Sequence, residues 1–189
     1  MKSSEELTAE ESLKIITDMI RKTKSSFHHN GFYFLFWGWV TVIGYLGSFI
    51  IGKFDLYHSP HLIWLITIPA FIVSMVYGAR SGKKQGARSY TSHVFMWLWI
   101  AVSFSIIITV AFGPQINFMI TPMILTFVAI PTFISGVLIK FKPLIYGGSG
   151  FWIFAALAFA FPPEYQNVFG GVAVILGYLV PGYMFKKTI

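Results

Sequence analysis

The chain has 189 residues, of which 56% are hydrophobic, 19% aromatic and only 11% charged, and its formal net charge is +7. A soluble domain usually carries about 25% charged residues, whereas long apolar runs separated by short polar loops are typical of membrane proteins. The composition therefore excludes a water-soluble enzyme, a disordered chain and a nucleic-acid-binding domain. Because the sequence has no cysteine, disulfides, thiolate metal sites and a cysteine nucleophile are also excluded.

Residues 1–30 form a polar arm that precedes the first apolar run. Thr8 and Glu11 have the spacing of a capping box, so we expect a helix to begin near Thr8. Downstream, apolar side chains recur on one helical face and charged ones on the opposite face. Such a helix is too polar to span a bilayer, so it is expected to lie on the cytoplasmic surface. It would anchor the first span or, through residues 8–27, dock a cytoplasmic partner.

Residues 31–189 are predicted to form an all-α integral membrane domain. A helix needs about 20 mostly apolar residues to cross a hydrocarbon core of about 30 Å, and six segments meet this requirement. No segment alternates between apolar and polar residues as the strands of a membrane barrel do. The predicted transmembrane helices are residues 31–51, 62–79, 93–112, 118–139, 144–161 and 168–185.

The positions of lysine and arginine predict the orientation of the chain. Thirteen of the fourteen lie in the arm, in the second-to-third and fourth-to-fifth connections, or in the C-terminal tail. Only Lys53 falls in a loop on the other side. Because cytoplasmic loops are enriched in these residues, we expect both termini in the cytoplasm and the protein in the plasma membrane.

An internal repeat is indicated by the even-numbered spans. The pattern Ile-Pro-x-Phe-Ile occurs at residues 68–72 and 130–134, with a weaker version around Pro181. The odd-numbered spans share pairs of aromatic residues. These similarities predict three helical hairpins arranged as a parallel repeat.

The prolines of this pattern, Pro69, Pro131 and Pro181, are expected to kink their helices, because proline removes one backbone hydrogen bond. Kinks related by pseudo-symmetry frame a central cavity in some repeat-built transporters. The alternative is a relic of duplication, since proline is common in membrane helices.

Four tryptophans are candidates for contact with an apolar ligand. Trp37, Trp39, Trp97 and Trp99 lie about two turns inside the predicted cytoplasmic boundary, which is deep for an interfacial belt. We expect them either to line a site between the odd-numbered helices or to belong to that belt.

Ionisable residues are absent from the predicted spans: none contains Asp, Glu, Lys or Arg. Such residues at depth usually mark ion or proton pathways. A proton-coupled antiporter, a metal pump and an intramembrane protease are therefore disfavoured.

Two loop segments offer weaker candidate sites. Asp55, His58 and His61 carry ordinary zinc ligands at a spacing that suits a helical turn, although interfacial residues exposed to water are the simpler interpretation. Residues 147–150, Gly-Gly-Ser-Gly, resemble a phosphate loop in composition only, and we interpret them as a flexible hairpin turn.

The leading hypothesis is a non-catalytic membrane protein that binds a neutral or lipid-like ligand, as a passive transporter or a sensor. The alternative is a structural or regulatory membrane subunit that docks a cytoplasmic protein through its N-terminal helix. An enzyme is disfavoured, because no nucleophile–base pair or metal cluster converges in the sequence. No cofactor is expected, and pairs of small residues four apart are compatible with a homo-oligomer.

Overall fold

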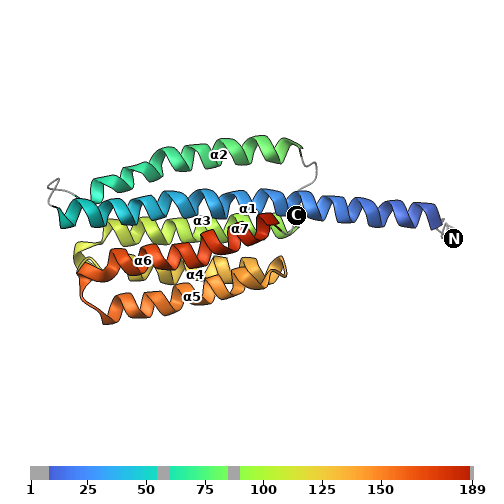
Figure 1. Ribbon diagram of the computed structural model, residues 1–189. Coiled ribbons are helices and arrows are strands. Elements are labelled where there is room, and N and C mark those ends of the chain that lie inside the picture. Colours follow the sequence, from blue (N-terminus) through green and yellow to red (C-terminus); the bar gives the residue numbers. More distant parts are fainter. Residues whose placement is uncertain (1–8, 55–59, 85–89, 188–189) are drawn as a thin grey trace.

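The described part of the chain is helical. The computed structural model describes residues 9–54, 60–84 and 90–187, and no strand occurs among them (Figure 1). Two short 3₁₀ helices and one longer one lie near the ends of the helices, and a π-helix interrupts the last span. The elements are α1 (Ala9–Lys53), η1 (Pro60–Ile66), α2 (Thr67–Lys84), α3 (Tyr90–Ala111), η2 (Pro114–Ile116), α4 (Ile120–Leu138), α5 (Lys142–Ala160), η3 (Pro163–Tyr165), α6 (Gln166–Val174), the π-helix η4 (Ile175–Leu179) and α7 (Val180–Lys187).

Six helical segments of the described chain are long and apolar enough to cross a membrane, which matches the predicted number of such helices. Their bounds lie within a few residues of the predicted ones, because the apolar length of a helix is a local property of the sequence. The segments are Gly31–Lys53, His61–Arg80, His93–Ala111, Ile120–Leu138, Lys142–Ala160 and Pro163–Phe185.

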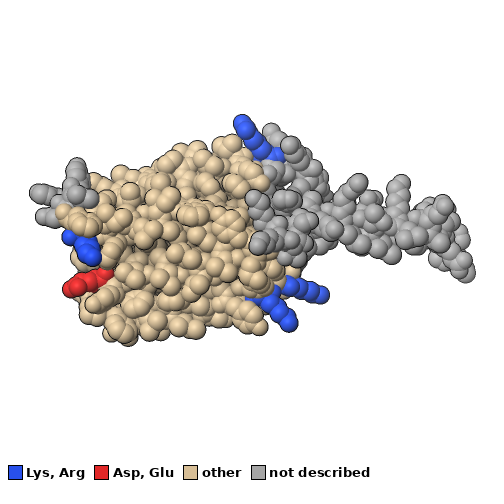
Figure 2. All heavy atoms as spheres, in the orientation of Figure 1, with Lys and Arg blue, Asp and Glu red and all other residues tan. Residues whose placement is uncertain are grey.

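Charged side chains lie at the two ends of the bundle, and the surface between them is uncharged in the view of Figure 2. Arg80 lies in α2 at the end where Lys140 and Lys142 join α4 to α5. Lys53 ends α1, and Glu164 lies in η3, at the other end. An uncharged middle flanked by charged ends is the distribution that a bilayer requires.

The first helix, α1, continues without interruption from the arm into the first span (Figure 1). Its described part begins at Ala9, so the helix start expected near Thr8 lies at the edge of the described residues and stays a prediction. We expected a separate surface helix, but the structure has a single helix of 45 residues. The physical reason is that no glycine or proline occurs between Ala9 and Gly31 to end it. The predicted apolar and charged faces of the arm concern side chains outside the described part of the structure.

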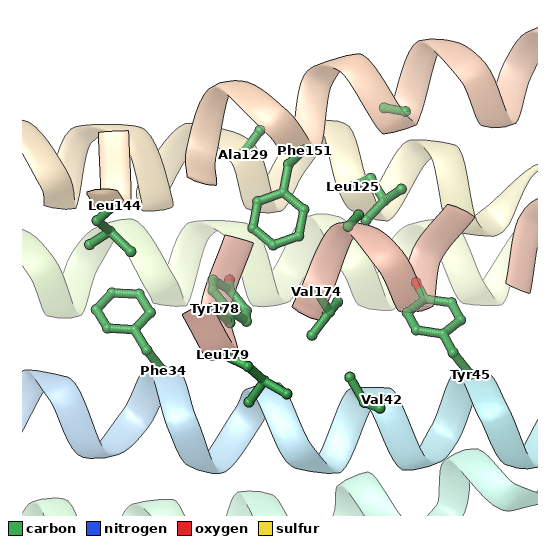
Figure 3. Close-up of a cluster of buried hydrophobic side chains, with 12 residues drawn as sticks. Phe34, Val42, Tyr45, Leu125, Ala129, Leu144, Phe151, Val174, Tyr178 and Leu179 are labelled. Atoms are coloured by element: carbon green, nitrogen blue, oxygen red, sulfur yellow. The ribbon is translucent and has the colours of Figure 1, made fainter. Parts of the chain in front are cut away.

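The core lies between α1, α4, α5 and the α6–η4 segment (Figure 3). Phe34 and Tyr45 reach into it from α1, Phe151 from α5 and Tyr178 from η4. Helix α2 packs mainly against α1 and η1 and lies at the edge of the bundle (Figure 1). The closest helix pair is α4 with α5, which belong to different predicted hairpins. The structure therefore does not show the predicted grouping into three hairpins.

The three prolines of the predicted repeat have three different settings. Pro69 is exposed in the first turn of α2, directly after a 3₁₀ helix. Pro131 is buried inside α4. Pro181 is buried at the start of α7, directly after the π-helix. The helix around each proline is built differently, and the predicted kinks stay a prediction.

Candidate functional site

The π-helix η4 changes the backbone hydrogen bonding of the last span. The N–H of Val180 donates to the carbonyl of Ile175, five residues earlier. Pro181 has no N–H to give to the carbonyl of Gly177, four residues earlier. Single-turn π-helices of this kind occur frequently at functional sites. The surroundings of η4 are therefore the first place to look for one.

Helix α5 touches η4 through two glycines. A Cβ atom added to Gly147 would lie 2.7 Å from the carbonyl oxygen and 3.0 Å from the Cα of Gly177. The two backbones are thus in direct contact, at a distance that any side chain would prevent. Weak Cα–H···O contacts recur at such helix–helix interfaces.

The next residue of α5, Gly148, packs on α4. A Cβ atom there would lie 2.6 Å from the backbone nitrogen of Phe133. Residues 147–150 therefore lie within α5 and do not form the flexible turn that we predicted. The reason is that small residues in membrane helices serve close packing, so glycine in such a helix does not by itself mark a turn.

The connection from α4 to α5 has a defined geometry. The N–H of Phe141 donates to the carbonyl of Gly136 at 2.9 Å, and Lys140 adopts the left-handed conformation with a φ of 54°. Together these features form a Schellman motif that ends α4. The motif places two lysines, Lys140 and Lys142, at the start of α5.

A groove runs along the outer surface between α5 and the η4–α7 segment, and we refer to it as the α5–α7 groove. Its volume is about 440 Å³. At Gly150 an added Cβ atom would meet no atom within 4 Å, so this part of α5 faces open space. The residues that line the groove are Lys142, Pro143, Tyr146, Gly147, Gly150, Phe154, Leu176, Val180, Pro181 and Met184.

The lining of the groove is apolar except at one end. Lys142 and Tyr146 contribute an ammonium group and a phenol near the start of α5. The first turn of α5 contains no acidic residue. The remaining lining residues are aliphatic, aromatic, glycine or proline. The groove thus offers an apolar trough with a cation at one end.

Two pairs of hydroxyl groups in the core join neighbouring helices. Thr132 in α4 donates to its own helix, at the carbonyl of Val128 2.7 Å away, and a hydrogen bond of 3.3 Å joins it to the Tyr178 hydroxyl. The Tyr45 hydroxyl is hydrogen-bonded to Thr121 in the same way. Buried polar groups with partners of this kind stabilise helix contacts in membranes, so we assign these pairs a structural role.

Two of the four tryptophans that the sequence suggested as ligand contacts lie largely on the surface of the bundle. The Nε1–H of Trp39 donates to the Tyr183 hydroxyl at 3.1 Å, which links α1 to α7. The Nε1–H of Trp97 donates to Nε2 of His93 at 2.9 Å, within α3. Both side chains are exposed, so each uses its polar atom within the protein and presents its ring to the surroundings.

The other two tryptophans, Trp37 and Trp99, lie near aromatic side chains. The Trp99 ring lies near the buried Tyr178, with ring centroids 6.5 Å apart. Trp37 meets the edge of Phe36 in its own helix, at 6.2 Å between ring centroids. The structure places the four tryptophans in four different surroundings and none of them in the α5–α7 groove.

The structure describes one of the three predicted zinc ligands. His61 is exposed in η1, whereas Asp55 and His58 lie outside the described residues. Within the described ranges, no three histidine or acidic side chains come together as a metal site would require. The metal site stays a prediction.

Sequence reasoning missed the α5–α7 groove, although a signal for it exists. Pro143, Gly147, Gly150 and Phe154 recur at helical spacing on one face of α5, directly after Lys142. The sequence shows that these residues share one helical face, but it does not show which helix lies beside that face.

Comparisons with protein-family models, curated proteins and solved structures found no match to this chain.

Proposed function

We propose that the chain is a non-catalytic multi-pass membrane protein that binds a lipid-like ligand in the α5–α7 groove. The groove carries this proposal. Its volume of about 440 Å³ falls within the range of roughly 300–1,000 Å³ found for small-molecule sites. Its mainly apolar lining suits a ligand with a long hydrocarbon part, and it opens where the bundle would face the bilayer.

The distribution of charge supports an orientation in which Lys140 and Lys142 face the cytoplasm. Arg80 lies at the same end of the bundle, and the sequence predicts thirteen of the fourteen lysines and arginines on this side. Such residues concentrate on the cytoplasmic side. The α5–α7 groove then opens to the cytoplasmic leaflet of the plasma membrane.

The filled core favours a sensor over a passive transporter. Phe151 and Tyr178 occupy the space between the helices, with ring centroids 5.0 Å apart (Figure 3). A cavity beside Phe34 and Leu144 has a volume of only about 10 Å³ and apolar walls. It has room for one water molecule at most and offers no polar partner for it. A surface groove, filled and emptied from the bilayer, fits lipid sensing better than passage through the bundle.

The test is to fill the groove with a side chain introduced in α5. Gly150→Leu places a side chain in open space, and leucine suits a helix better than glycine, so the variant should fold. Native mass spectrometry of gently extracted protein should show a lipid bound to the wild type, and roughly tenfold less of it bound to Gly150→Leu, since loss of about 1.4 kcal/mol of contact suffices for that.

The matched control is Ala156→Leu, an exposed position of α5 outside the groove. This variant should retain as much lipid as the wild type. If Gly150→Leu and Ala156→Leu retain lipid equally, the proposal is wrong.

A second candidate function is supported by the shape of α1. This helix extends beyond the rest of the bundle (Figure 1), as a docking element for a cytoplasmic protein would. A structural or regulatory subunit of this kind would retain a polypeptide in the same mass spectra. Deletion of residues 1–27 should then remove the polypeptide, and retention of lipid alone would exclude this candidate.

A further inference from the structure

Charge is distributed unevenly along the α5–α7 groove. Lys142 lines one end of it, and Lys140 lies two residues earlier in the turn. Glu164, the one acidic side chain among those the structure describes, lies at the opposite end of the bundle. The groove is therefore complementary to an anionic group at the Lys142 end and to an uncharged, apolar group elsewhere.

The length of the groove matches one leaflet of a bilayer. Its α5 wall runs from Lys142 to Phe154, over which an α-helix rises about 18 Å. Half of a hydrocarbon core is about 15 Å thick. With Lys142 at the headgroup level, the apolar part of the groove spans the depth of the acyl chains in that leaflet.

The floor of the groove suits an unbranched chain. Gly150 leaves the α5 backbone bare on this face, whereas Gly147 lies at the base of the groove, where α5 meets the backbone of Gly177; Met184 borders the groove on the opposite side. The bare backbone at Gly150 accepts a narrow hydrocarbon at van der Waals distance.

From these observations we infer that the α5–α7 groove binds an anionic phospholipid, with its phosphate at Lys142 and one acyl chain along the groove past Gly150. The inference rests on the proposed function and names the ligand class. A zwitterionic phospholipid also carries a phosphate, but its headgroup cation would lie beside Lys140 and Lys142. Two ammonium groups at this end favour a headgroup with a net negative charge over one that adds a further cation.

The experiment uses the full-length protein in phosphatidylcholine vesicles. A phosphatidylglycerol or a phosphatidylcholine with a photoreactive group in its acyl chain is added in equimolar amounts, and cross-linked peptides are mapped. The phosphatidylglycerol probe should label α5 and α7 several-fold more than the phosphatidylcholine probe. Lys142→Gln should lower its labelling about fivefold, the usual contribution of one lysine near an anionic lipid. Lys53→Gln, at the opposite end, should leave both labels unchanged.

The outcomes separate the inference from the proposed function. Equal labelling by the two probes, abolished by Gly150→Leu, would overturn anionic selectivity and leave the groove as a lipid site. Selectivity that persists in Lys142→Gln would overturn the role of this lysine. Labelling by both probes that is unchanged in Gly150→Leu would overturn the inference and the proposed function together.

Discussion

Gly148→Ala is expected to destabilise the bundle by about 2 kcal/mol, in the middle of the range for overpacked contacts. The new methyl group would lie 2.6 Å from the backbone nitrogen and 2.7 Å from the Cα of Phe133. Backbone atoms cannot swing aside as the end of a flexible side chain can. Helices α4 and α5, the closest pair in the structure, would have to move apart along their shared face.

Gly150→Ala is the matched control, two residues further along the same helix. Its methyl group would meet no atom within 4 Å, and alanine in a helix is favoured over glycine by roughly 0.5–1 kcal/mol. This variant should therefore be as stable as the wild type or slightly more stable. Reversible unfolding in mixed detergent micelles measures both changes. Equal free energies of unfolding for the two variants would contradict the close contact between α4 and α5.

The predicted orientation of the bundle determines which introduced cysteines react on intact cells. The chain has no cysteine, so each introduced cysteine is the only thiol in the protein. Glu164→Cys should react with a membrane-impermeant maleimide on intact cells. Arg80→Cys, which lies at the opposite end of the bundle (Figure 1), should react only after the membrane is opened. The reason is the concentration of lysine and arginine at the Arg80 end.

Reversed labelling would place the Lys142 end outside the cell, and the α5–α7 groove would then face the outer leaflet. Labelling of both cysteines on intact cells would contradict a fixed orientation. Total labelling in detergent, where both thiols are accessible, serves as the reference for each variant.

The number of helices and the approximate bounds of the spans could be predicted because they depend on local properties. A run of about 20 apolar residues requires a helix in a bilayer whatever its neighbours are. The length of α1 could not be predicted from charge alone, since the absence of glycine and proline before Gly31 outweighed the change in polarity.

The contacts between helices could not be predicted from the same sequence. Gly147 and Gly148 are adjacent, yet one packs on η4 and the other on α4. Which helix each glycine meets depends on the arrangement of the whole bundle. For the same reason the tryptophans, which are similar in the sequence, have different surroundings in the structure.

The π-helix is a second reason why the groove could not be predicted from the sequence. Its α5 wall is visible as a helical face, but its other wall follows a π-helix that shifts every later residue of the span around the helix axis. Regular helical spacing would place Val180 and Met184 elsewhere. Pro181, which we expected to kink a helix around a central cavity, lines a groove on the outer surface.

The most direct test of lipid binding is a crystal structure of the full-length chain grown from a lipid mesophase that contains phosphatidylglycerol. We predict elongated density along the groove past Gly150 that ends in a phosphate beside Lys142. A groove occupied by the side chains of the protein itself, with α5 and α7 in contact along its length, would contradict the account.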